Sequence, residues 1–390
     1  MHPAGQIATP TDRAGTAPVR LDAAPDGLGA RVRDTIDPEL AAEWMALAAD
    51  AAEPNAFAEP WFVAASLAAF GATRDVRLIE VRSGNALIGM MPVAIEHRYG
   101  RMPVRFLQNW CHHQMFLGTP LVRAGQGRAF WTAVFELLDG ADWATGFFHL
   151  RGVVEEGPVH RALLDVRPGT IVHRETRAFL ESDLSPDAYY KQAVRPKKRK
   201  EIRRLQNRLG ELGKVRVRRL EEGADLHAWA DAFLALEKAG WKGQAGSALA
   251  STPETESFFF TALAGAWEAG RLQFLRLDLD DRPIAMLVNF LTPPGSFSFK
   301  TAFDEAYARF SPGVLIQLEN LDILDRPDIA WMDSCAVEDH PMIDSLWTGR
   351  RHMVRVTVRL AGARRSATYA AARTAEIGWT ALRCLMGKAR

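Results

Sequence analysis

Apolar and polar positions follow two rhythms along the chain, one typical of helices and one typical of strands. In the first half, apolar residues recur at helical spacing from Asp37 onward, and a second helix is expected over 60–70. Two strand-like runs flank Arg82-Ser83-Gly84-Asn85, a sequence that indicates a hairpin turn. The expected strands are 76–81, 86–95, 104–107, 116–121 and 147–150, with a helix over 125–138.

The second half repeats this order of elements. Strands are expected over 272–279, 283–291 and 297–302, followed by a helix that begins at Ser311-Pro312-Gly313 and runs to Leu324. At a fixed offset of 196 positions, Ile79 falls on Leu275 and Met90 on Met286. We therefore predict an internal duplication, although two amphipathic hairpins also agree this well by chance.

Composition divides the chain into four parts. Hydrophobic residues make up 48% of the 390 positions and charged residues 24%, which is typical of globular proteins with a sizeable core. Ala, Gly, Pro and Thr dominate the first 30 residues, so we expect a disordered tail. The expected parts are a tail over 1–32, mixed α/β domains over 33–182 and 183–360, and a basic helix over 361–390.

Cysteine usage and hydropathy indicate the cellular compartment in which the protein is expected. The three cysteines show no paired spacing, which is typical of neither a disulfide framework nor a zinc module. The longest apolar run, 61–70, is too short to span a bilayer, and the first residues lack the apolar core of a signal peptide. We expect a soluble, cytoplasmic protein.

The net charge of +1 conceals two basic segments. Residues 195–208 hold eight basic residues and one acid, and residues 350–390 hold ten basic residues and one acid. In the first segment, Lys198 falls within an apolar stripe that is expected to bury one helix side: Ile202, Leu205, Leu209 and Leu212. A solvated charged face is one explanation. Like charges at i,i+4 spacing are mildly destabilising, however, which favours an anionic partner.

Four segments together resemble a known family. The arrangement is similar to the GNAT-fold acyltransferases grouped with the CelD-like proteins of cellulose biosynthesis, which are related to the FemAB-type tandem-GNAT transferases. The resemblance covers about 185–347 by sequence and 37–180 by shape alone, and it implies a mixed α/β sheet with two GNAT-like copies. The segments that carry it are 195–205, 236–243, 270–285 and 299–313.

The resemblance implies acyl-CoA as co-substrate, with its pantetheine arm along the strand 297–302. The diphosphate is then expected at the start of the next helix, where free amides and the helix dipole favour anions. The implied cofactor-binding residues are Phe310, Ser311, Gly313 and Val314. On spacing alone, the same residues are an ordinary helix start. The usual signature Gln/Arg-x-x-Gly-x-Gly/Ala is absent, and FemAB-type relatives use aminoacyl-tRNA instead of acyl-CoA.

Three residues near the strand end are candidates for the chemistry that the resemblance implies, attack of an amine or hydroxyl on a thioester. Lys300 is expected to hold an anion, Asp304 to accept a proton and Tyr307 to donate one to the leaving thiolate. Asp304 equally suits a cap of the turn, and Tyr307 equally suits packing.

A second cluster is a candidate acceptor site. Glu237 and Trp241 lie four residues apart on one expected helix face, beside Lys242. Together with Arg195 and Lys198 of the basic helix they form the expected substrate-binding set, although Trp241 also suits a core position. The expected partners are a small-molecule or sugar acceptor and an anionic ligand at 195–208, with no DNA. The terminal helix is expected to dock on the domain in preference to a membrane surface.

Other constellations are weaker. Cys111-His112-His113 resembles half of a metal site without a second ligand pair, so no metal is expected. Asp333-Ser334-Cys335 with Asp339-His340 holds the residue types of a nucleophilic triad but lacks the Gly-x-Ser-x-Gly elbow. The sequence therefore favours a GNAT-type acyltransferase that acts in polysaccharide or cell-envelope biosynthesis. Two alternatives stay open: an aminoacyl-tRNA-dependent transferase, and a non-catalytic pair that binds an anionic polymer or a membrane surface.

Overall fold

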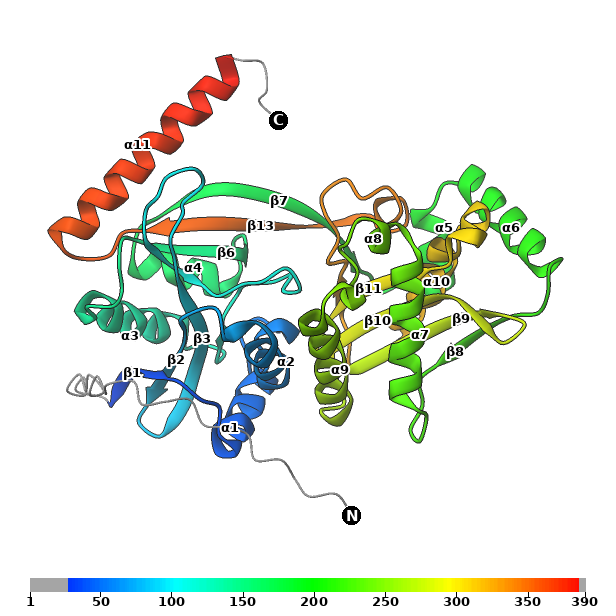
Figure 1. The fold of residues 1–390 in the computed structure, drawn as a ribbon, viewed down its shortest axis with the longest axis horizontal. Helices are drawn as coiled ribbons and strands as arrows, with labels where there is room; N and C mark the ends of the chain where they lie inside the picture. The colour runs from blue at the N-terminus through cyan, green and yellow to red at the C-terminus, as the bar shows by residue number, and fades with distance from the viewer. Residues whose placement is uncertain (1–26, 386–390) are drawn as a thin grey trace.

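The computed structural model describes residues 27–385, with side chains described to residue 379 (Figure 1). Most of the expected tail, residues 1–26, lies outside this range. The expectation of disorder up to residue 32 is wrong, because Leu28–Arg33 form the strand β1. This strand pairs with β2 along its full length, and Leu28, Ala30 and Val32 pack against the core of the first half. Burial of these apolar side chains accounts for its order.

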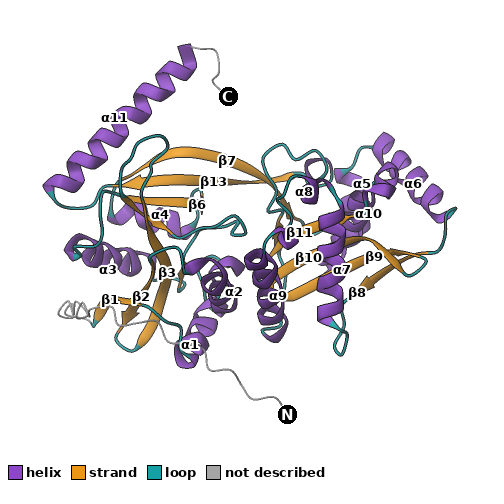
Figure 2. Ribbon diagram, viewed as in Figure 1, coloured by secondary structure: helices purple, strands orange, loops and turns teal. Residues whose placement is uncertain are grey.

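One sheet of 13 strands runs through the whole molecule (Figure 2). Its order is β1-β2-β3-β4-β6-β13-β7-β12-β11-β10-β9-β8, with β5 paired to β3. The strands are β1 Leu28–Arg33, β2 Val76–Ser83, β3 Ala86–Glu96, β4 Phe106–Asn109, β5 Leu121–Val122, β6 Phe148–Val154, β7 Gly169–Glu181, β8 Val215–Arg219, β9 Leu272–Leu279, β10 Arg282–Thr292, β11 Gly295–Phe303, β12 Trp331–Asp333 and β13 Gly349–Val358.

Helices cover both faces of the second half of this sheet. Helices α7 and α9 lie on one face, and α5, α6 and α10 lie on the other, each with its own apolar core. The helices are α1 Pro38–Ala49, α2 Pro60–Ser66, α3 Gly127–Gly140, α4 Pro158–Val166, α5 Pro186–Ala193, α6 Pro196–Gly210, α7 Leu226–Ala239, α8 Trp241–Gln244, α9 Pro253–Glu268, α10 Pro312–Glu319 and α11 Ala363–Leu385. Two 3-10 segments matter below, η4 Glu305–Phe310 and η5 Asn320–Asp325.

The two hairpins that suggested a duplication have the same register. In the first, Ile79 pairs with Met91 and Val81 with Gly89. In the second, Leu275 pairs with Leu287 and Leu277 with Ala285. Each pair of the second hairpin lies 196 positions after the corresponding pair of the first. The match between the two sequences therefore extends to how their strands pair. The mixed α/β fold therefore holds two GNAT-like copies.

The two copies exchange strands. β13 follows the second copy in the chain, yet it pairs with β6 of the first copy and with β7. β7 in turn ends the first copy and pairs with β12 of the second. Figure 1 shows both as long strands that bridge the two halves. The expected boundary at 182/183 thus falls directly after β7 in the chain. It assigns β13 to the second domain, although both strands that pair with β13 belong to the first.

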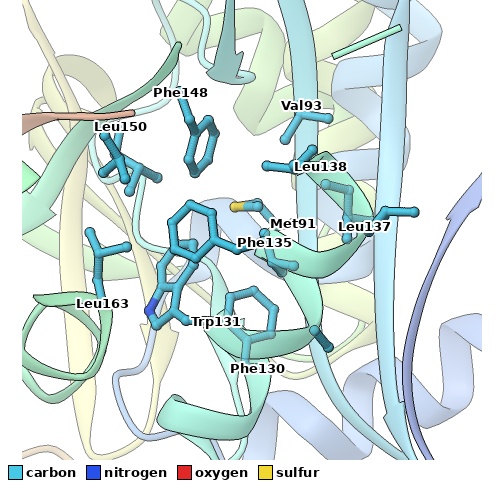
Figure 3. Close-up of a cluster of buried hydrophobic side chains, with 14 of the residues drawn as sticks. Met91, Val93, Phe130, Trp131, Phe135, Leu137, Leu138, Phe148, Leu150 and Leu163 are labelled. Carbon is cyan, nitrogen blue, oxygen red and sulfur yellow. The ribbon is translucent and has the colours of Figure 1, made fainter. Parts of the chain in front are cut away.

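An aromatic core joins the copies, and a separate core fills the first. Phe57 of the first copy contacts the rings of Phe290, Phe297 and Phe299 of the second at centroid distances of 5.1–6.4 Å. The core of the first copy packs α3 and α4 on the sheet through Phe130, Trp131, Phe135, Phe148 and Leu163 (Figure 3).

Some expected elements differ from the structure. The strand expected over 116–121 is confined to Leu121–Val122, and the helix expected to reach Leu324 becomes the 3-10 segment η5 after Glu319. Leu212 is 48% exposed, so the apolar stripe of α6 ends at Leu209. The helix ends at Gly210, which carries Leu212 beyond the buried face.

Candidate active site

A β-bulge in β11 sets the position of Lys300. Val288 pairs with Lys300 and Asn289 with Ser298, which leaves Phe299 as an extra residue on β11. One extra residue places two consecutive side chains on the same face of a sheet. Phe299 and Lys300 therefore both lie on the face covered by α7 and α9, whereas Ser298 and Thr301 contact Gln317 of α10 on the other face.

β11 and β12 separate beside this bulge. They form a parallel pair over Gly295–Phe297 and Trp331–Asp333. Beyond Asp333 the chain turns towards β7, where the Ser334 amide donates to the Ala178 carbonyl. Within the described chain, residues 298–303 of β11 have no strand partner on that side. Their backbone groups form a free edge that an extended, amide-containing molecule can pair with.

Two parallel strands also separate in the first copy, but there the side chain of Asn109 fills the gap between them. β4 and β6 pair in parallel over two residues each. Beyond them, the Asn109 side chain accepts from the Arg151 amide at 2.8 Å and donates to the Arg151 carbonyl at 3.0 Å. Asn109 thus satisfies backbone groups that stay free in β11, which favours the second copy as the place for a bound donor.

Glu237, Trp241 and Lys242 meet the end of β11 at a small cavity of about 30 Å³. Glu237, Lys242 and Thr301 are among its lining residues. Glu237 is buried, accepts from Lys242 Nζ at 2.8 Å, and accepts from the Leu249 amide at 2.7 Å. Trp241 is 59% exposed, so a core position for this residue is wrong.

Lys300 is held among aromatic rings and charges. Its Nζ atom lies 5.5 Å from the ring centroid of Phe116, a residue of the first copy, and 5.6 Å from that of Phe299. Burial, reinforced by the nearby charge of Lys242, lowers the pKa of Lys300 to about 8, while the charge of Glu237 opposes this shift. The amine therefore changes charge close to physiological pH.

The other two predicted catalytic residues, Asp304 and Tyr307, make structural contacts. The Asp304 carboxylate caps η4 by accepting from the Ala306 amide at 3.0 Å, and it pairs with Arg282 at 2.7 Å. Tyr307 is half-buried and packs against the core on the α10 face. Neither Asp304 nor Tyr307 lines the cavity at Glu237, so the structure does not bring these two residues to the cluster.

The start of α10 does not fit a diphosphate. The amides of Ser311 and Val314 already donate to the carbonyls of Ala308 and Ser311, and Pro312 has no N–H. Gly313 is buried, and a Cβ there would lie 3.2 Å from Met342 and 3.3 Å from Phe303. Phe310 is buried in the core of the α10 face. The row of free amides expected over 310–314 is therefore interrupted, because the Ser311 amide is engaged by the 3-10 turn and the Val314 amide by the first turn of α10.

The basic helix α6 lies beside η4. Lys198 is half-buried and burial lowers its pKa, whereas Arg195 is exposed at the start of the helix. α6 packs on η4. Neither residue lines the cavity at Glu237. The predicted substrate-binding set thus divides into two places, the cavity at α7–α8 and the basic face of α6.

Sequence reasoning missed the residues around Lys300 that come from distant segments. Phe116 lies under the amine. Cys335, considered above only as part of a triad, influences the charge of Lys300, and Arg177 influences that of Cys335. Asp333 accepts from the Cys335 amide at 2.8 Å and pairs with Arg351, so this triplet forms a turn. No local pattern marks Phe116, which sits in a loop where a strand was expected. The described residues contain no cluster of three or more metal-ligating side chains.

Among residues 27–385, no helix combines the length and the apolar character that crossing a bilayer requires.

Comparisons with known proteins agree with this architecture. Residues 196–336 match the family described as acetyltransferase (GNAT) domain. The solved structure of FemX is similar at 11% identity and a TM-score of 0.55, covering 84% of this chain and 96% of FemX. L-PGS from Bacillus licheniformis is similar at 12% identity and a TM-score of 0.51, covering 86% and 96%.

A protein of unknown function from Bacteroides thetaiotaomicron shares the fold at 12% identity and a TM-score of 0.52, covering 84% of this chain and 99% of its own. No curated protein sequence matches the chain. The chain therefore has a FemX-like fold of two GNAT-type copies, and its residues 196–336 match the acetyltransferase (GNAT) domain family.

Proposed function

We propose that the protein transfers an acyl group to an amine at the Lys300 cluster of the second copy. The observation that carries this proposal is the position of Lys300 beside the free edge of β11, in a cluster with Glu237 and Lys242. The GNAT domain supports acyl transfer as the reaction class. Transfer to a nitrogen, and a product for the cell envelope or a polysaccharide, are the finer parts of the proposal.

Lys300 is the residue that acts on the reacting atoms. The acceptor nitrogen forms a bond to the acyl carbon, the bond from that carbon to the leaving sulfur or oxygen breaks, and the nitrogen loses a proton to solvent. Negative charge develops on the carbonyl oxygen meanwhile. The Lys300 ammonium stabilises this charge, and its partly buried site strengthens the interaction. Phe299 and Phe116 limit the access of water to the ammonium.

Acyl-CoA is the donor that we propose first. The free edge of β11 suits the amides of a pantetheine arm, whereas the start of α10 does not suit the diphosphate. The basic side chains of α6, which packs on η4, are the proposed contact for the phosphates. An aminoacyl ester of tRNA is the alternative donor, because it needs neither a diphosphate site at α10 nor amide pairing along β11.

A panel of donors tests the proposal. Purified protein is incubated with acetyl-CoA, longer acyl-CoAs or aminoacyl-tRNA and a mixture of amino sugars and amino acids, and products are identified by mass spectrometry. We expect an N-acylated product that falls by about 100-fold or more in Lys300→Met, as for other oxyanion-stabilising groups. Lys300→Arg keeps the charge and is expected to retain part of the activity. Equal activity in wild type and Lys300→Met would contradict the role of Lys300.

A non-catalytic, anion-binding protein is the second candidate. It is favoured by the engaged amides at α10 and by the exposed basic face of α6. It predicts salt-dependent retention on RNA or anionic vesicles without turnover of any donor, with a loss of retention in Lys197→Gln/Lys200→Gln.

A further inference from the structure

A cavity in the first copy lies outside both the GNAT domain and the Lys300 cluster. It measures about 100 Å³ and is lined by β6, β7, β13 and the loop that follows β4. A single water needs roughly 10–15 Å³ by the same measure, so the cavity holds several waters or an ion of a few heavy atoms. Three arginines line it, Arg151, Arg177 and Arg355.

Two of these arginines lie opposite each other on adjacent strands. Val354 pairs with Val153 and Val356 with Leu150, so Arg151 and Gly152 of β6 together oppose Arg355 of β13. Gly152 has a φ of 64°, which permits this bulge. Val354 and Val356 are buried in the core, and Arg355 lines the cavity. Like charges directly opposite each other destabilise a sheet.

The one carboxylate that lines the cavity, that of Glu175, already forms an ion pair with the third arginine, Arg177. Glu175 pairs with Arg177, which also donates to the Phe116 carbonyl. Within the described chain, neither Arg151 nor Arg355 has an acidic partner or any other side-chain hydrogen bond. His112 adds no charge at neutral pH, because burial lowers its pKa to about 3, and its Nε2 atom is buried without a partner.

The unpaired charges act on their surroundings. Burial and the charge of Arg151 lower the pKa of Arg355. Both arginines also contribute, after burial, to the low pKa of about 3 of His149. Two half-buried guanidinium groups thus face one cavity whose single carboxylate, Glu175, is paired with Arg177 and only partly offsets the charge of Arg355. A bound oxyanion stabilises such an arrangement through charge-assisted hydrogen bonds.

We propose that this cavity binds a small oxyanion, a carboxylate or a phosphate group, between Arg151 and Arg355. The site goes beyond acyl transfer, since it lies in the copy where Asn109 fills the gap between the separated strands. Phe116 forms the wall between the two places: its ring faces Lys300 Nζ, and the residue also lines the cavity. An anion bound here therefore lies one aromatic side chain away from the Lys300 cluster.

Titration calorimetry with the full chain tests the site, using inorganic phosphate and succinate at constant ionic strength. We expect one of the two anions to bind with a Kd of about 1 mM or tighter, and Arg151→Gln and Arg355→Gln each to weaken it by about tenfold or more. Preference between the two anions distinguishes a phosphate site from a carboxylate site. Arg174→Gln, which removes a β7 arginine paired with Glu155 at 2.7 Å, is the matched control and is expected to bind as wild type.

Thermal unfolding without the anion separates a binding role from a structural one. Because each Gln variant removes repulsion, its melting temperature is expected to equal or exceed that of wild type. The proposal is overturned if neither anion binds the wild type at about 10 mM, or if the Gln variants bind as wild type does. It is also overturned if both Gln variants melt well below wild type, since the arginines would then be satisfied within the protein.

Discussion

Lys300 shows how burial and two charged neighbours set the charge of one side chain. Burial and Lys242 disfavour its ammonium, and Glu237 favours it. Glu237 is itself fixed by Lys242 Nζ and by the Leu249 amide, so the acid and the second lysine keep constant positions beside the amine. The charge of Lys300 therefore responds in opposite directions to the removal of its two charged neighbours.

The first prediction uses this opposition. If the ammonium is the active form, activity declines as pH rises through about 8, where Lys300 loses its proton. Glu237→Gln is expected to lower the midpoint of this decline, and Lys242→Met is expected to raise it. The measurement is kcat/KM against pH for the three proteins. Midpoints that move in the same direction would show that the two side chains act on activity through structure alone.

The second prediction concerns stability. The pKa of Lys300 is about 8 in the folded protein and 10.5 when unperturbed, so below pH 8 both states are protonated and the full cost of burying the charge is present. Between pH 8 and 10.5 the unfolded state holds more protons, and stability rises with pH. Lys300→Met is expected to stabilise the protein at pH 7 by roughly 1–3 kcal/mol.

Urea unfolding at pH 7 and pH 10 provides the measurement for this variant. The advantage of Lys300→Met over wild type is expected to shrink at the higher pH, because wild-type Lys300 is then neutral in the folded state. If the difference in unfolding free energy between the two proteins is the same at both pH values, burial of the Lys300 charge does not destabilise the folded state.

At the scale of elements, the short pair of β11 and β12 decides where the sheet opens. Three residue pairs hold these strands together. Gly295 permits the contact, because a Cβ at this position would lie 2.2 Å from the Trp331 ring. The free edge beside Lys300 depends on this pair, since it fixes the point at which the strands separate.

The third prediction follows from that contact. Gly295→Ala is expected to displace Trp331 and to destabilise the protein by about 1–3 kcal/mol, as other overpacking substitutions do. Gly29→Ala is the control, because a Cβ at this strand glycine meets nothing within 4 Å. Urea unfolding of both variants checks the difference. Similar stabilities for the two would mean that the Trp331 ring moves aside without cost.

The sequence predicted the hairpins of both copies, because apolar runs of strand length and the turn residues between them define them. It did not predict β7, whose residues are mostly half-buried and include His173-Arg174-Glu175. Pairing with β12 and β13 stabilises this strand, and such distant partners leave no local signal. The Phe116 wall escaped prediction for the same reason. The edge of β11, by contrast, was expected at 297–302 from the family resemblance, and Lys300, Glu237 and Lys242 were found from their segments.

At the scale of the molecule, the aromatic core around Phe57 makes the two copies one folding unit. The Phe57 side chain is fully buried, and its ring contacts come from both copies. Strand exchange through β7 and β13 adds backbone pairing to this interface. We expect wild type to unfold in a single transition, since neither copy keeps a complete core without the other.

The fourth prediction tests this coupling. Phe57→Ala is expected to lower the free energy of unfolding by about 3–5 kcal/mol and to split the calorimetric transition into two. Phe135→Ala removes an equally buried ring from the core of the first copy alone, and it is expected to destabilise without splitting. If Phe57→Ala also unfolds in one transition, the coupling of the two copies does not depend on the Phe57 ring.

The late position of β13 has a consequence for synthesis on the ribosome. β6 emerges about 200 residues before the strand that pairs with it. At roughly 5–20 residues per second, the nascent first copy waits about 10–40 s with that edge unsatisfied. An exposed strand edge is a template for aggregation. Folding of the amino-terminal half is therefore completed only after β13 has emerged, and until then the free edge of β6 is open to pairing with other chains.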